Sequence, residues 1–266
     1  MHRLLLLLSC LILLPITSFA LETTDLAHGL GFGCAVSVNQ KLYCWGNDER
    51  VLSAIPDLAG VTQIAAFSTH ACALGGGKIT CWGDDSNQQT EVPADLSKAV
   101  SISVGNSYSC GATANSVVCW GKKHPRFGDL FSRQFSSIRK IAVEPNGPLK
   151  NGYVHLCLLD GRKVECFSER AQAEIPPPAD LGEVRGIKVG MRHACGLTDS
   201  GWKCWGDKTY YEPIFKQGEL EIGDFDSKAY HWNEYCLVQN GRTRCGHGPE
   251  APDDMIGVWK VVSGPL

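Results

Sequence analysis

The stretch THACALGGGKITCWGDD, residues 69–85, decides the fold because its pattern recurs along the whole chain. Two cysteines lie nine residues apart around a run of glycines, and Trp-Gly follows the second cysteine. Six cysteine pairs occur, five of them nine residues apart and four followed by Trp-Gly, and their first cysteines are separated by 38, 38, 47, 38 and 41 residues. The pairs are Cys34 and Cys44, Cys72 and Cys81, Cys110 and Cys119, Cys157 and Cys166, Cys195 and Cys204, and Cys236 and Cys245. A period of about 40 residues predicts a repeat architecture.

The spacing of nine has a geometric meaning in a β-hairpin. Two strands joined by a two-residue turn pair symmetrically about it, so Cys72 faces Cys81 when the turn falls on Gly76-Gly77. The last repeat places its turn on Asn240-Gly241, a strong hairpin signal. The cysteines are then the fourth pair from the turn, a non-hydrogen-bonded site where α-carbons approach to about 4.5 Å. This distance permits a disulfide, so the sequence predicts six disulfides, each within its own hairpin.

The first pair and the other possible uses of cysteine need separate treatment. Cys34 and Cys44 are ten residues apart, which requires a three-residue turn or a bulge near Asn39. Structural zinc sites need cysteines two to four residues apart in two clusters, and no such spacing occurs. A redox dithiol would need Cys-x-x-Cys, which is also absent. We therefore expect no metal and no cofactor.

The first 20 residues, MHRLLLLLSCLILLPITSFA, are typical of a secretory signal peptide cleaved after Ala20. The apolar run is short for a membrane anchor, and Pro15 interrupts it. A lipoprotein site at Cys10 fits less well, because apolar sequence continues beyond it. Cleavage leaves twelve cysteines, an even number in an oxidising compartment. We expect a secreted or periplasmic protein with no membrane span, whose residues 21–266 form one domain.

Each repeat supplies a short Val/Ile strand, a hairpin and a polar loop that carries a Pro-Asp-Leu type element, as at residues 55–58 and 92–96. Repeats of this length built from short strands predict an all-β fold, a β-propeller of six blades. A linear β-solenoid is the alternative. The first repeat lacks a good Val/Ile strand, and the C-terminal stretch GVWKVVSGPL would supply it. This predicts a ring closed by pairing of the two ends of the chain.

The pattern Gly-x-x-His-x-Cys, followed by Cys-Trp-Gly, resembles the regulator of chromosome condensation repeat family over residues 29–266. The resemblance is greatest to its short secreted members, such as the bacterial propeller-type β-lactamase inhibitor and the crinkly repeats of plant receptor kinases. It implies a propeller that binds other proteins through one face of the ring. The chain has six repeats where rings of that family commonly have seven.

Histidines precede three of the first cysteines by two residues, at His70, His155 and His193, and could form a metal or catalytic ring. Phe32 and Tyr108 replace them in other repeats, which favours a buried structural role. The tryptophans after the second cysteines keep the same phase and are expected in the core. The motifs of serine hydrolases, zinc proteases and phosphate-binding loops are absent.

The net charge of −3 argues against a nucleic-acid binder. We expect a monomer that binds another protein and has no catalytic activity. The alternative is a hydrolase or lyase acting on a polysaccharide in the central channel. Insertions that break the repeat often carry binding residues, and Tyr, Trp and Arg dominate interfaces. The partner-binding candidates are Arg126, Phe127, Tyr153, Tyr210, Tyr211, His231 and Trp232.

Overall fold

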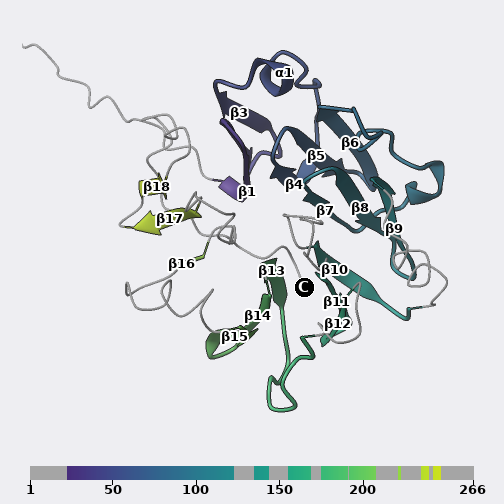
Figure 1. The fold of residues 1–266 in the computed structure, drawn as a ribbon, viewed down its shortest axis with the longest axis vertical. Coiled ribbons are helices and arrows are strands. Elements are labelled where there is room, and N and C mark those ends of the chain that lie inside the picture. The colour runs from purple at the N-terminus through teal and green to yellow at the C-terminus, as the bar shows by residue number, and fades with distance from the viewer. Residues whose placement is uncertain are drawn as a thin grey trace, which may run out of the picture.

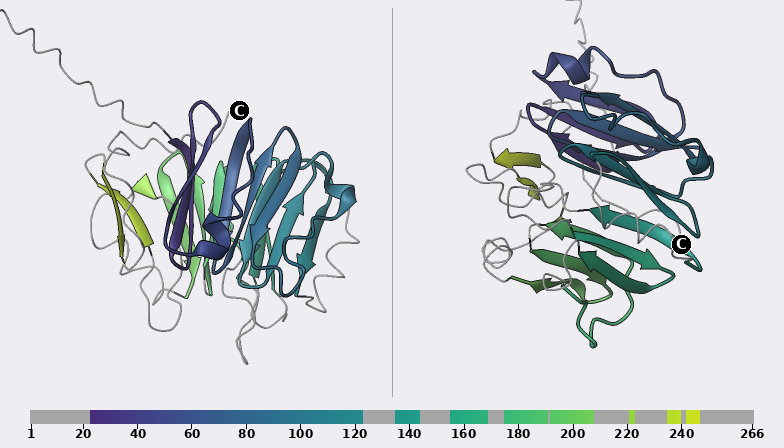
Figure 2. Two further views of the ribbon diagram at one scale, coloured as in Figure 1. Left: turned by 90° about the horizontal axis from the view of Figure 1, so that it is seen from above. Right: turned by 45° about the vertical axis from the view of Figure 1, so that its right-hand side comes forward.

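The structure, a computed structural model, describes residues 23–122, 135–143, 155–168, 175–190, 192–207, 221–222, 235–239 and 242–246. For the last three ranges only the backbone is described. The described residues form six antiparallel sheets of three strands each. Figure 1 shows the sheets following one another in chain order around a centre, and Figure 2 shows their strands standing side by side.

Every sheet is built from three strands consecutive in the chain. The first three sheets are β1 (Thr23–Gly29), β2 (Phe32–Ser37) and β3 (Leu42–Gly46); β4 (Val61–Phe67), β5 (His70–Gly75) and β6 (Lys78–Gly83); and β7 (Ser101–Gly105), β8 (Tyr108–Ala112) and β9 (Val117–Gly121). The last three are β10 (Ile138–Val143), β11 (His155–Asp160) and β12 (Lys163–Ser168); β13 (Gly186–Gly190), β14 (His193–Thr198) and β15 (Gly201–Gly206); and β16 (Glu221–Ile222), β17 (Tyr235–Gln239) and β18 (Arg242–Gly246). We call the strands of each sheet inner, middle and outer, in that order.

The first sheet corrects the expectation about chain closure. Its inner strand is β1, Thr23–Gly29, and not the C-terminal stretch. The prediction required a Val/Ile strand, but an inner strand turns one side toward the centre and needs few large apolar residues. In β1 the residues Leu26 and Ala27 are buried, and Asp25 and His28 line the central cavity. The stretch GVWKVVSGPL, residues 257–266, which was predicted to close the ring, lies outside the described part of the chain.

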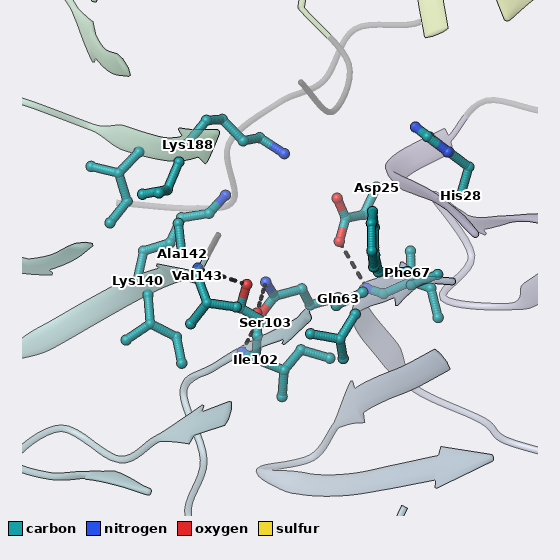
Figure 3. A pocket seen from close by; sticks show the side chains of 17 residues that line it. Asp25, His28, Gln63, Phe67, Ile102, Ser103, Lys140, Ala142, Val143 and Lys188 are labelled. Atoms are coloured by element: carbon teal, nitrogen blue, oxygen red, sulfur yellow. Dashed lines mark hydrogen bonds between the residues drawn. The ribbon is translucent and has the colours of Figure 1, made fainter. Parts of the chain in front are cut away.

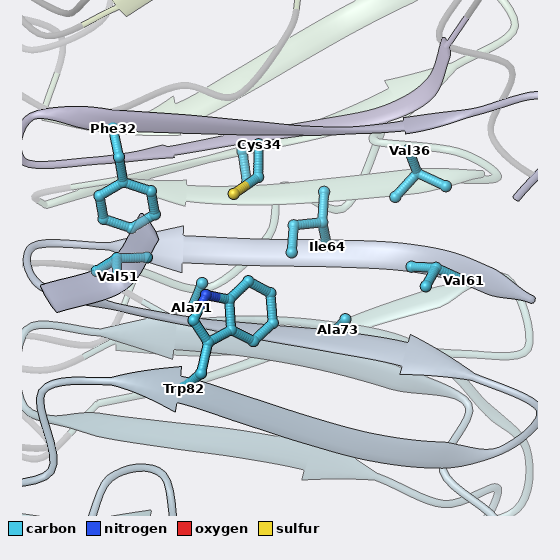
Figure 4. Packing of buried hydrophobic residues seen from close by; sticks show 10 residues of the cluster. Phe32, Cys34, Val36, Val51, Val61, Ile64, Ala71, Ala73 and Trp82 are labelled. Atoms are coloured by element: carbon cyan, nitrogen blue, oxygen red, sulfur yellow. The ribbon is translucent and has the colours of Figure 1, made fainter. Parts of the chain in front are cut away.

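The middle strands are buried on both sides because each sheet packs between two neighbours. All six residues of β2 are buried, whereas the outer strand β3 is only partly so. Figure 4 shows the core between the first two sheets, where Phe32 and Cys34 face Ile64 and Trp82. A strand buried on both faces reads as a continuous apolar run, which explains why sequences such as HLCLLD, the strand β11, show no alternation.

The hairpin geometry confirms the disulfide prediction for five of the six pairs. The first five cysteine pairs are bonded within their own hairpins, with α-carbons 4.0 to 4.1 Å apart. The turn between β5 and β6 falls on Gly76 and Gly77, whose φ angles of 57° and 78° suit a tight hairpin turn. In the last hairpin the backbone register sets Cys236 opposite Cys245. The side chains of that pair lie outside the described part.

The longer first hairpin has the predicted three-residue turn. The amide of Ser37 donates to the carbonyl of Lys41 at 2.9 Å, and this bond encloses Val38, Asn39 and Gln40. Gln40 takes up the extra residue by adopting a positive φ of 60°. The disulfide Cys34–Cys44 therefore keeps the same cross-strand position as the others.

Candidate functional site: the central cavity and the face around it

The inner strands enclose a cavity of about 90 Å³ at the centre of the molecule. Residues of β1, β4, β7, β10 and β13 line it, and Figure 3 shows their side chains converging from these strands. Side chains alternate along a strand, so polar residues face the cavity between apolar ones that face the core. In β13, for example, Lys188 lies between the buried residues Ile187 and Val189.

Several polar side chains at the cavity join one inner strand to the next. Gln63 accepts from the amide of Ile102 and donates to its carbonyl, both at 3.0 Å. The Asp25 carboxylate accepts from the amide of Ile64 at 2.8 Å. Between β7 and β10, the hydroxyls of Ser101 and Ser103 each accept a backbone amide of β10 at 3.1 Å. Asp25, Gln63 and Ser103 belong to the cavity wall, so part of its polar surface is used to hold neighbouring sheets together.

The charged groups of the described cavity wall are Asp25, Lys140 and Lys188, with His28 beside them. Burial raises the pKa of the Asp25 carboxyl above its usual range, and Lys140 and Lys188 act in the opposite direction. Burial also lowers the pKa of His28 to about 4, and Lys188 adds to the lowering. His28 is therefore uncharged near neutral pH. Figure 3 shows both lysines extending into the cavity toward Asp25.

The repeated histidines lie between sheets, away from the cavity lining. His70, His155 and His193 are at most 1% exposed, as are Phe32 and Tyr108 at the same position of other repeats. His70 Nε2 shares a hydrogen bond of 3.0 Å with the hydroxyl of Ser109 in the next sheet. Burial lowers the pKa of His70 to about 4, despite the opposing effect of Asp84. These histidines have the structural role expected from the sequence.

The tryptophans after the second cysteines also pack between elements. Trp82, Trp120 and Trp205 are buried, and Trp45 is half-buried. Trp120 donates its indole N–H to the carbonyl of Gln89 at 2.8 Å. Gln89 belongs to the loop that follows the preceding sheet. Trp205 makes the same kind of bond to Ile175 at 2.9 Å. In these two repeats the tryptophan therefore fixes the loop between consecutive sheets, whereas the indole N–H of Trp82 has no hydrogen-bond partner.

One end of the sheets carries connections of very different length. At this end, which we call the first-turn face, each inner strand turns into its middle strand. Two residues make this connection in four sheets, at 30–31, 68–69, 106–107 and 191–192. In the fourth and sixth sheets the chain between the strands is much longer, at residues 144–154 and 223–234. The outer strands β9 and β15 also end at this face, because they run antiparallel to the middle strands.

The seven partner-binding candidates all lie outside the described residues. Their places in the chain can still be compared with the strand ends. Tyr153 belongs to 144–154, and His231 and Trp232 belong to 223–234. The pairs Arg126-Phe127 and Tyr210-Tyr211 follow closely after β9 and β15. Every one of these segments is therefore attached to strand ends at the first-turn face.

Sequence reasoning missed the charged lining of the cavity. Asp25, His28, Lys140 and Lys188 were not among the candidates, because no local pattern shows which strand positions face a common axis. A usable signal was a charged residue between two β-branched ones, as in Ile187-Lys188-Val189. Among the residues that the structure describes, no group of three or more metal-ligating side chains occurs. In the same part of the chain, no helix is long and apolar enough to cross a membrane.

No protein-family model and no curated protein matches the sequence. Solved structures do match. The chain is similar to the ectodomain of the Physcomitrella patens receptor kinase CR4, with a TM-score of 0.51 and 24% identity over 70% of this chain and 52% of that one. It is also similar to the CRINKLY WD40 ectodomain of the Arabidopsis thaliana receptor kinase ACR4, with a TM-score of 0.51 and 20% identity over 71% of this chain and 70% of that one.

The fold is propeller-like. The expected resemblance to regulator of chromosome condensation repeats is confirmed at the level of the fold by the crinkly ectodomains. A weaker similarity, with a TM-score of 0.46 and 15% identity, relates 84% of this chain to 66% of yeast RCC1 (Prp20). The chain spans about half the length of the CR4 ectodomain that it matches. Five intramolecular disulfides are typical of proteins in oxidising compartments.

Proposed function

We propose that this chain is an exported β-propeller of six blades that binds another protein through its first-turn face. Residues 1–20 would direct export to the periplasm or the exterior, and residues 21–266 would form the propeller. The six three-stranded sheets and the likeness to receptor ectodomains support the architecture. The five disulfides support an oxidising destination.

The connection lengths at the first-turn face carry the proposal. Connections of two residues in four sheets stand beside segments of eleven and twelve residues, 144–154 and 223–234. In repeat proteins, insertions map to loops on one face, and that face is often the binding face. All seven candidates chosen from the sequence belong to segments attached here. Aromatic and arginine side chains are the types that dominate protein interfaces.

The described cavity gives little support to the alternative of an enzyme acting on polysaccharide. Pockets that bind small organic molecules usually measure about 300–1,000 Å³, whereas this cavity measures about 90 Å³. Most glycosidases use a pair of carboxylates, and Asp25 is the only carboxylate among the described lining residues. The lining residues Gln63 and Ser103 are already bonded to backbone groups.

A capture experiment with matched variants tests the proposal. Purified protein would be immobilised and exposed to an extract of the compartment to which it is exported, and captured proteins would be identified by mass spectrometry. One variant replaces Tyr210, Tyr211, His231 and Trp232 by alanine. The control variant replaces Val38 and Val100 by alanine. These two residues are 49% and 41% exposed, and they lie at the ends of the strands opposite the first-turn face.

The expected result is a protein retained by the wild type and by the control, and lost from the first-turn-face variant. Circular dichroism would establish that both variants are folded. Retention of the same proteins by all three would exclude the first-turn face as the binding surface. If the wild type retains no protein beyond those that an unrelated propeller also retains, the proposed binding function is rejected.

A further inference from the structure

The disulfide Cys72–Cys81 has a polar neighbour that breaks the repeat. The sulfur of Cys72 lies 3.5 Å from the hydroxyl oxygen of Ser109, which belongs to β8 of the next sheet. A disulfide sulfur carries no proton, so this is a van der Waals contact in the oxidised protein. Cys72 is 1% exposed and Ser109 is fully buried. The hydroxyl group is therefore held against the buried end of the crosslink, where solvent does not reach.

The position of Ser109 is apolar at the three other junctions between sheets whose side chains are described. In each sheet this residue directly precedes the first cysteine and packs toward the first cysteine of the sheet before it. The residues in this position are Ala71, Leu156 and Ala194, which share core clusters with Cys34, Cys110 and Cys157 respectively. Ser109 therefore places a hydroxyl group beside a disulfide where the repeat otherwise has a hydrocarbon side chain.

The Ser109 hydroxyl belongs to a chain of hydrogen bonds whose directions can be assigned. It donates its one proton to the carbonyl of Gln89 at 2.9 Å, so the bond of 3.0 Å with His70 Nε2 is donated by the ring. The other ring nitrogen, Nδ1, is buried without a hydrogen-bond partner, as the unprotonated nitrogen of a neutral ring. The Gln89 carbonyl also accepts from the indole of Trp120 at 2.8 Å. It keeps that donor when the Ser109 hydroxyl turns toward Cys72.

The two ends of the crosslink differ in their access to solvent. Cys72 is buried in the middle strand, whereas Cys81 in the outer strand is only partly buried. A thiol from solvent therefore reaches Cys81 first, and Cys72 becomes the leaving sulfur. Exchange is faster when the leaving thiol has a lower pKa, and apolar burial raises the pKa of a thiol. A hydroxyl that can donate to Cys72 makes it a better leaving group than the cysteines at the apolar junctions.

We propose that Cys72–Cys81 is a thiol-exchange site that reacts with small thiols such as glutathione. The thiol loses its proton to solvent, attacks Cys81 Sγ and forms a mixed disulfide there. The bond between the two cysteines breaks, and its electron pair stays on Cys72 Sγ as a thiolate. The Ser109 hydroxyl turns from Gln89 to donate to this thiolate, while His70 continues to donate to Ser109.

The reaction is completed by a second thiol. It loses its proton to solvent, attacks the sulfur of the first thiol and releases Cys81 as a thiolate, which takes a proton from water. The products are the oxidised disulfide of the small thiol and an open crosslink. The site does not depend on the binding face proposed above.

Timed reduction of the oxidised mature chain tests the proposal. The protein would be exposed to reduced glutathione at about pH 8, quenched with acid at intervals and alkylated in denaturant with N-ethylmaleimide. Mass spectrometry of the peptides then gives the state of each cysteine. Cys72–Cys81 should open at least about fivefold faster than Cys34–Cys44, Cys110–Cys119 and Cys157–Cys166. Early in the reaction, glutathione should be found on Cys81 and the maleimide on Cys72.

The variant S109A removes the hydroxyl and leaves the residue that two other sheets already have at this position. It should slow the opening of Cys72–Cys81 to the rates of the crosslinks at the apolar junctions. S101A is the matched control, because Ser101 lies in the same sheet and its hydroxyl bonds to the amide of Ile141. It should leave the opening rate of Cys72–Cys81 unchanged.

The variant A194S tests the same chemistry as a gain. Ala194 shares a core cluster with Cys157, and His155 precedes Cys157 by two residues, as His70 precedes Cys72. A serine at position 194 would therefore build the same set of histidine, serine and cysteine between the fourth and fifth sheets. We expect A194S to open the Cys157 crosslink several times faster than wild type.

Equal opening rates for the four compared crosslinks of the wild type would overturn the proposal. Faster opening in S109A would also overturn it, because exchange would then follow loosening of the sheets and not stabilisation of the leaving sulfur. Glutathione found on Cys72 would contradict the direction of attack. An unchanged rate for the Cys157 crosslink in A194S would contradict the role of the hydroxyl. Circular dichroism and melting curves would establish that each variant is folded.

Discussion

His70 makes the stability of the protein depend on pH in a way that can be isolated. Its imidazole is buried between two sheets, and burial lowers its pKa from 6.5 to about 4. Between these values the unfolded chain binds a proton that the folded chain does not, so acid favours unfolding. The resulting loss of unfolding free energy is absent well above pH 6.5 and grows as the pH falls toward the pKa of His70 in the folded protein. It amounts to about 2 kcal/mol at about pH 5.

The assay compares wild type with H70Q in urea unfolding at about pH 8 and about pH 5. Glutamine does not titrate, and its amide can still bond to the Ser109 hydroxyl. His28, Asp25 and other titrating groups occur in both proteins, so their effects cancel in the difference. On acidification, wild type should lose about 2 kcal/mol more of its unfolding free energy than H70Q. Equal losses in the two proteins would refute the claim that folding keeps His70 neutral.

Three substitutions test the hairpins and the contacts between sheets. Replacing Cys72 and Cys81 together by alanine removes a crosslink worth up to about 2.7 kcal/mol. Calorimetry should show the melting temperature falling by about 5–10 °C. A decrease of less than about 2 °C would contradict the claim that this disulfide stabilises the fold. G76A has open space for its methyl group but keeps a φ of 57°, so urea unfolding should show a loss of about 1 kcal/mol from backbone strain alone. Q63A leaves the amide and carbonyl of Ile102 without their partner and should cost about 2 kcal/mol in the same assay, whereas a neutral result would show that water replaces the glutamine.

The hairpins could be predicted from sequence because their pairing is local. A two-residue turn fixes which residues face each other, so the positions of Cys72, Cys81 and the glycines between them were enough. The inner strand β1 could not be recognised in the same way. In the folded protein this strand only buries Leu26 and Ala27 and places Asp25 at the cavity. Such a strand has no continuous apolar or β-branched pattern.

The cavity was beyond sequence reasoning for a different reason. Whether Lys140 faces a core or an axis depends on how five inner strands, far apart in the chain, lie against one another. The face on which the irregular connections gather depends similarly on strand direction, which the repeat pattern alone does not give. The partner-binding candidates could therefore be chosen by residue type, but the strand ends beside them had to come from the structure.

The local pairing of the cysteines has a consequence for how the protein matures. In the five described crosslinks, the partners are nine or ten residues apart. A nascent chain entering an oxidising space can close each of these bonds as soon as one short segment has emerged, before the next repeat arrives. The nearest available thiol is then the correct one, so maturation should need little help from enzymes that reshuffle mispaired bonds.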